Sequence, residues 1–208
     1  RHHGDDRAHL HPPLTLERST ELHLLLSPRR AYARLAPGSA SYVAGYVLFA
    51  SVLIAAAAGT AATGRITLSM LLSLTLGWMF VPLTQVLIGA ALVASARAPR
   101  DGGNGALALL LRGHAPWSLY LLAASVAIAA SAVFGHGYDA YRIMTFAAIV
   151  PLLLTLRIVH AFSVEVLRTS ARGALLRALA HQGVTWLVAA AYLDRAVSLL
   201  PRIQGWLS

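Results

Sequence analysis

Two basic side chains lie three residues apart within an apolar stretch at 143–164. At this spacing Arg157 and His160 share one helical face, near the expected cytosolic end of the stretch. An ionisable side chain in a membrane span is a candidate functional group, although the long Arg157 side chain could instead snorkel to the headgroups. With Arg168 and Arg172 on the segment that follows, Arg157 and His160 predict a basic pocket for an anionic lipid headgroup.

Two further polar side chains fall inside apolar stretches. Gln85 follows Pro82 by three residues, so it either satisfies the backbone carbonyl that the proline frees or contacts a substrate. Asp194 either pairs with Arg195, ends a shorter span or marks a site. Convergence of Gln85, Asp194 and Arg157 on one space would indicate a transporter or a lipid-handling protein, whereas scattered positions would indicate structural roles.

The sequence lacks the side-chain arrangements that catalysis requires. The chain has no cysteine, which excludes thiolate catalysis and cysteine-ligated metal sites. His114, His136 and His160 lie on different segments, and no HExxH or Glu-x-x-His motif places two ligands on one helix. The glycine-rich turn at 102–105 lacks the Lys-Ser/Thr of a phosphate-binding loop. These observations predict a protein that is not an enzyme, and they support no metal, haem, pigment or other cofactor.

The elements that must position these residues follow from composition. Hydrophobic residues make up 57% of the 208 residues and charged residues 12%, about half the charged share of a typical soluble domain. Five apolar stretches are each long enough, at about 1.5 Å per residue, to cross a hydrocarbon core of about 30 Å. They lie at roughly 41–63, 67–95, 117–134, 143–164 and 184–200. The sequence therefore predicts an all-α, polytopic transmembrane helix bundle of about five spans with short interfacial helices.

Two of the five predicted spans carry specific expectations. Pro82 predicts a kink or a tilt in the second span. The limits of the fifth span stay open, because its apolar window could instead begin near Ala174. That earlier start would bury Arg177 and His181.

The chain is expected to divide into a polar tail at 1–26, an interfacial helix at 27–38 and a transmembrane domain at 39–208. Pro28 suits the first turn of the interfacial helix, and Pro37-Gly38 ends it before the first span. The arginines of this helix are expected to reach lipid headgroups. The side chains expected to face lipid are Ala31, Tyr32 and Leu35.

Positive charge is distributed unevenly along the chain. All 17 basic residues are arginine, and twelve of them lie in the N-terminal segment and in the loops at 96–116 and 165–183, which also predict short amphipathic helices. Four lie in the opposite connections, so the positive-inside rule predicts a cytosolic N-terminus and an outside C-terminus. The lack of lysine is typical of a GC-rich bacterial genome, which indicates an inner (plasma) membrane. A net charge of +9 beside the spans favours anionic lipids over nucleic acid as partners.

The order of several motifs is similar to that of a known family. Pro28 is followed four residues later by the aromatic Tyr32, ahead of the first span, and a basic, glycine-containing loop lies at 100–105. Gly113-His114-Ala115-Pro116 then opens the third span. This layout resembles the Yip1 family of five-span membrane proteins over residues 26–200. The resemblance implies an adaptor-like, non-enzymatic protein of membrane trafficking or organisation.

The poverty of catalytic motifs favours a non-enzymatic scaffold or accessory subunit of a bacterial inner-membrane assembly. Its expected partners are membrane lipids and membrane-protein subunits. The alternative is a small transporter or lipid-handling protein in which Gln85, Arg157 and Asp194 line a cavity.

Overall fold

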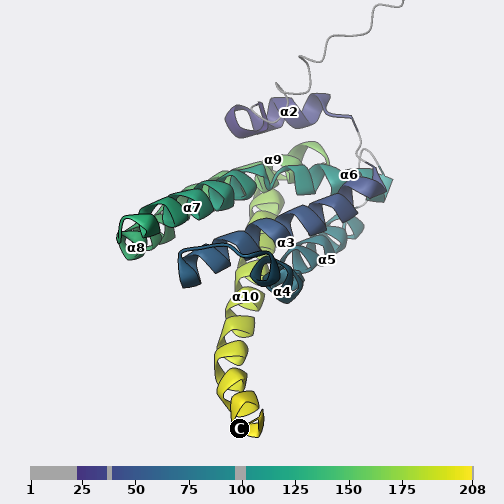
Figure 1. Cartoon of the computed structure of the whole chain (residues 1–208). Coiled ribbons are helices and arrows are strands. Elements are labelled where there is room, and N and C mark those ends of the chain that lie inside the picture. The colour runs from purple at the N-terminus through teal and green to yellow at the C-terminus, as the bar shows by residue number, and fades with distance from the viewer. Residues whose placement is uncertain (1–22, 37–38, 97–101, 208) are drawn as a thin grey trace, which may run out of the picture.

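The computed structural model describes residues 23–36, 39–96 and 102–207, and this part of the chain is helical without any strand (Figure 1). The predicted all-α class is therefore confirmed, while most of the predicted polar tail lies outside the described residues. The helices are α2 (Pro28–Arg34), α3 (Ala40–Thr63), α4 (Leu68–Trp78), α5 (Phe80–Ala94), α6 (Gly102–Arg112), α7 (Ala115–Val133), α8 (Gly137–Ala147), α9 (Ile149–Glu165) and α10 (Ala171–Leu207).

Four helical segments of the described chain are long and apolar enough to cross a membrane. They are α3, the pair α4 and α5, the pair α6 and α7, and the pair α8 and α9, which cover Ala40–Thr63, Leu68–Ala94, Gly102–Val133 and Gly137–Glu165. Four of the five predicted spans are thus confirmed by length and composition. The fifth, at 184–200, lies within α10 and stays a prediction.

A proline divides each of two spans into two helices. A proline in a helix lacks the N–H that would bond to the carbonyl four residues earlier, and its ring clashes with that carbonyl. Those earlier residues are Trp78 for Pro82 and Ala147 for Pro151, and they are the last residues of α4 and α8. The predicted kink in the second span is confirmed. The break before Pro151 was not predicted, and with α8 the fourth span begins before the predicted residue 143.

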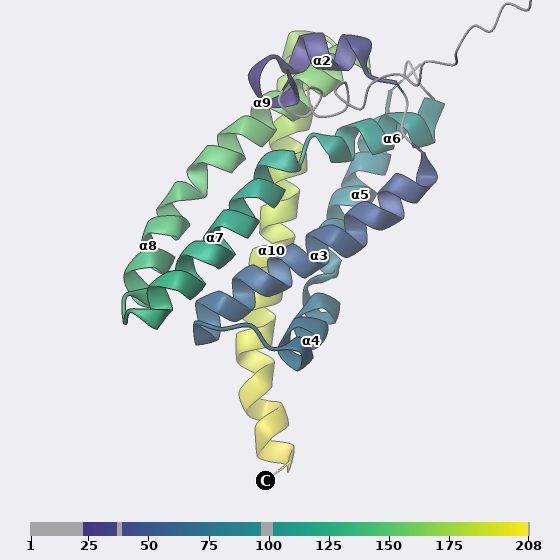
Figure 2. The same ribbon diagram turned by 45° about the horizontal axis from the view of Figure 1, so that its top comes forward.

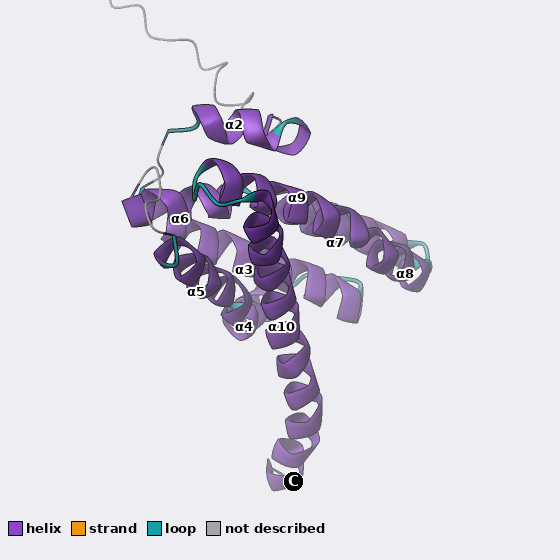
Figure 3. Ribbon diagram, turned by 180° about the vertical axis from the view of Figure 1, so that it is seen from behind, coloured by secondary structure: helices purple, strands orange, loops and turns teal. Residues whose placement is uncertain are grey.

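The loop predicted at 165–183 is largely the start of α10. Helix α9 ends at Glu165 and α10 begins at Ala171, so the short amphipathic helix predicted in this loop is not a separate element. No proline interrupts the sequence from 171 to 200, and α10 continues across the bundle beside α5 and α9. Its C-terminal half extends past the ends of the other described helices (Figures 1 and 3). His181, which the alternative start near Ala174 would bury, is fully buried, while the limits of the fifth span stay a prediction.

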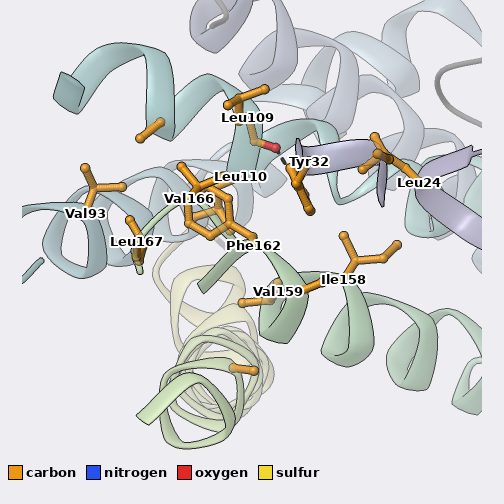
Figure 4. Packing of buried hydrophobic residues seen from close by; sticks show 14 residues of the cluster. Leu24, Tyr32, Val93, Leu109, Leu110, Ile158, Val159, Phe162, Val166 and Leu167 are labelled. Atoms are coloured by element: carbon orange, nitrogen blue, oxygen red, sulfur yellow. Dashed lines mark hydrogen bonds between the residues drawn. The ribbon is translucent and has the colours of Figure 1, made fainter. Parts of the chain in front are cut away.

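Helix α2 packs on the arginine-rich end of the bundle, above α6 and α9 (Figure 2). It is separate from α3, as predicted. Tyr32 is completely buried, its ring lies edge-on to Phe162 at 5.6 Å between centroids, and its hydroxyl donates to the carbonyl of Leu109 at 3.3 Å (Figure 4). Burial raises the pKa of Tyr32 above its ordinary value, so this hydroxyl stays protonated and donates.

The prediction that Ala31, Tyr32 and Leu35 face lipid is wrong. Ala31 and Tyr32 are buried in the protein core, and Leu35 packs against it. The physical reason is a protein surface formed by buried side chains of α6 and α9. These are Leu109, Leu110, Ile158, Val159 and Phe162, which belong to the same core cluster as Ala31 and Tyr32. The arginines of α2 remain exposed, as expected.

Candidate functional site: a basic pocket and an intramembrane pocket

The predicted pair Arg157 and His160 lines a cavity where α9 meets α2. The cavity has a volume of about 430 Å³, and we call it the basic pocket. Its described lining consists of Ser27, Pro28, Arg29, Arg30, Arg157, His160 and Ala161. Three arginines and one histidine therefore face one space, and none of the described lining residues is acidic.

Two hydrogen bonds hold the α9 side of the basic pocket. The Nη2 of Arg157 donates to the carbonyl of Leu26 at 3.1 Å, which occupies one of the five N–H donors of the guanidinium group. The Nε2 of His160 lies 3.3 Å from the carbonyl of Ala171, to which it donates in the tautomer that carries a proton there. Both partners are neutral carbonyls, so neither bond cancels the charge of Arg157.

The other two predicted lipid-binding residues lie elsewhere. Arg168 and Arg172 are exposed around the turn between α9 and α10, and Arg168 takes a left-handed backbone conformation with φ of 53°. They are not among the described residues that line the basic pocket. Arg29 and Arg30 supply the additional charge instead. Sequence reasoning gave these two a lipid contact, but it could not place them beside Arg157 because that requires the docking of α2.

Gln85 and Asp194 do not join Arg157. Asp194 is exposed on α10, and Gln85 accepts a hydrogen bond from the hydroxyl of Tyr46, with 2.5 Å between the oxygens. The side-chain oxygen of Gln85 therefore joins α5 to α3. A bond to the carbonyl freed by Pro82 would use the amide NH₂ group of Gln85, and it stays a prediction. The three polar residues proposed to converge are scattered, and the cavity expected from them does not form.

A different polar cluster surrounds Gln85. A cavity of about 170 Å³ lies between α3, α5, α7 and α10, and we call it the intramembrane pocket. Its walls include three tryptophans, and its polar lining consists of Tyr46, Gln85, His114, Ser118, Gln182 and Thr185. Sequence reasoning missed this pocket because it treated His114 as isolated and placed Gln182 in a loop.

The rings of His114 and His181 pack together beside the intramembrane pocket. Their centroids are 5.1 Å apart, and both side chains are buried. Across the described residues, no group of three or more histidine, cysteine, aspartate or glutamate side chains is placed to hold a metal ion. The two histidines lie on segments 67 residues apart in sequence, so only the return of α10 across the bundle brings them together.

Four apolar helical segments, two of them broken by proline, define this chain as a helical membrane protein. No family model matches the chain, and comparisons with characterised proteins and with solved structures likewise found no match. The resemblance to the Yip1 family therefore rests on the sequence alone, on the motifs around Pro28 and Gly113 and the loop at 100–105.

Proposed function

We propose that this chain is a non-enzymatic protein of a bacterial inner membrane that binds anionic lipid headgroups in the basic pocket. The observation that carries the proposal is the convergence of Arg29, Arg30, Arg157 and His160 on one cavity whose described lining has no acidic residue. A lipid phosphate supplies the missing negative charge.

The chemistry of arginine supports a phosphate ligand. The planar guanidinium group donates two parallel hydrogen bonds to phosphate oxygens and is permanently charged. Each basic residue near an anionic membrane surface contributes about 1 kcal/mol to lipid attraction. Burial of Tyr32 fixes α2 on α6 and α9, and this holds Arg29 and Arg30 beside Arg157 before any lipid arrives.

Replacement of Arg157 by glutamine tests the lipid proposal. The glutamine amide keeps a donor for the Leu26 carbonyl but removes the charge, so anionic lipid that co-purifies with the protein should fall about fivefold while the fold persists. Lipid mass spectrometry after purification in a mild detergent measures this. Arg65→Gln is the matched control, because Arg65 is an exposed arginine in the turn between α3 and α4. Equal lipid content in both variants contradicts the proposal.

A second candidate function is that of an accessory subunit in a larger assembly. The observation that favours it is the extension of α10 beyond the other described helices, which offers a helix for a partner protein (Figure 2). Partner subunits present in fixed ratio in the same preparation would support this function, and it is compatible with bound lipid.

The orientation we propose has the arginine-rich end, with α2, in the cytosol and α10 crossing to the outside. It rests on the arginine asymmetry of the loops. A green fluorescent protein fused before Arg1 should therefore fluoresce, and alkaline phosphatase fused after Ser208 should be active. A fluorescent C-terminal fusion would show instead that α10 returns to the cytosol.

A further inference from the structure

The intramembrane pocket contains two polar atoms that the protein leaves without partners. His114 is 1% exposed and Gln182 is 6% exposed, and both line the pocket. The Nε2 of His114 and the Nε2 of Gln182 have no hydrogen-bond partner. Buried polar atoms are normally hydrogen-bonded, so each such exception requires an explanation.

These two atoms have opposite hydrogen-bonding character. The Nδ1 of His114 lies 3.3 Å from the carbonyl of Leu110, and a carbonyl can only accept. In the neutral imidazole the Nδ1 therefore carries the proton, and the Nε2 is an acceptor. The Nε2 of Gln182 belongs to an amide NH₂ group and can only donate. A ligand that satisfies both must donate to His114 and accept from Gln182.

Two other polar side chains of the intramembrane pocket already donate hydrogen bonds within the protein. The hydroxyl of Thr185 donates to the carbonyl of His181 at 2.8 Å. The hydroxyl of Tyr46 donates to Gln85. None of the described lining residues is charged, and a buried ionic ligand without a counter-charge would be strongly disfavoured. The ligand is therefore neutral.

The size and walls of the pocket define the rest of the ligand. An engineered apolar cavity of about 150 Å³ holds benzene, so about 170 Å³ accommodates a single six-membered ring with a small substituent. Trp78, Trp117 and Trp186 line the pocket, and aromatic rings pack on each other in offset or edge-on arrangements. A single hydroxyl group both donates and accepts.

We infer that the intramembrane pocket binds a neutral, single-ring phenol, with its hydroxyl donating to the Nε2 of His114 and accepting from the Nε2 of Gln182. This site is separate from the basic pocket, and it does not depend on lipid binding there.

Equilibrium dialysis of phenol and of anisole, its methyl ether, tests this inference on the full chain in lipid nanodiscs. Phenol should bind saturably, at one molecule per chain, above its partitioning into empty nanodiscs. Anisole has no proton to donate to His114, so it should bind about tenfold more weakly. Phenol uptake equal to that of empty nanodiscs overturns the inference, and so does equal affinity for the two compounds.

Three variants assign the hydrogen bonds. His114→Phe should lower phenol affinity to that of anisole and leave anisole unchanged. Gln182→Leu should lower the affinity for both ligands about tenfold, because the oxygen of each ligand accepts from Gln182. If His114→Phe does not fold, this variant tests the inference alone. His136→Phe, at an exposed position before α8, should change neither affinity. A His114→Phe variant that still binds phenol more tightly than anisole overturns the inference.

Discussion

Replacement of Gly113 by alanine is expected to lower the thermal unfolding temperature markedly. A Cβ atom at this position would lie 2.7 Å from the Cγ2 of Ile158, 2.7 Å from the hydroxyl of Tyr32 and 3.0 Å from the carbonyl of Leu110. These neighbours belong to α9, α2 and α6, so the added methyl group has contacts on three sides. Overpacking of this kind costs about 1–3 kcal/mol. Size-exclusion chromatography after heating steps measures the loss.

Gly45→Ala is the matched control for this experiment. Gly45 lies within α3, and a Cβ there would meet nothing within 4 Å. Because glycine in a helix is less favourable than alanine by roughly 0.5–1 kcal/mol, this substitution should be neutral or slightly stabilising. Equal effects of the two substitutions would mean that α2, α6 and α9 do not meet at Gly113.

Replacement of Tyr32 by alanine is expected to detach α2 from the bundle. Truncation of a fully buried aromatic side chain to alanine lowers the stability by about 3–5 kcal/mol. Tyr32 is the largest fully buried residue of this helix. The detached helix should be cut by trypsin at Arg29, Arg30 and Arg34 far faster than in the parent protein, because cleavage follows the population of the open form. Limited proteolysis with mass spectrometry of the fragments measures this.

The same variant should also lose bound anionic lipid, because Arg29 and Arg30 leave the basic pocket with α2. Tyr32→Phe keeps the ring against Phe162 and removes only the hydrogen bond to Leu109, which is worth about 1 kcal/mol. It should therefore stay close to the parent protein in both measurements. Resistance of Tyr32→Ala to trypsin would show that α2 is held by other contacts.

Sequence patterns predicted the parts of the fold that depend on local properties. Apolar length located four spans, and the kink in the second followed from Pro82 because a proline acts on its own helix. Pro151 carries the same signal and was overlooked. The helical face shared by Arg157 and His160 could likewise be predicted from the sequence, because it depends only on a spacing of three residues.

Features that depend on packing between distant segments were not predicted. Tyr32 was expected in lipid because an amphipathic segment beside a membrane gives the same pattern whether lipid or protein covers its apolar face. His114 and Gln182 meet only because α10 starts earlier than its apolar window and returns across the bundle. Neither contact can be predicted from the spacing of residues within one segment.

The contacts of α2 also impose an order on how the protein is made. Leu26 and Arg157, which bond to each other, are 131 residues apart, so at roughly 5–20 residues per second the ribosome needs about 7–26 seconds to supply the second after the first. Until α9 has emerged, the surface that receives Tyr32 is incomplete, because Leu109 belongs to α6 but Phe162 belongs to α9. Closure of α2 onto α9 is a late step of biogenesis.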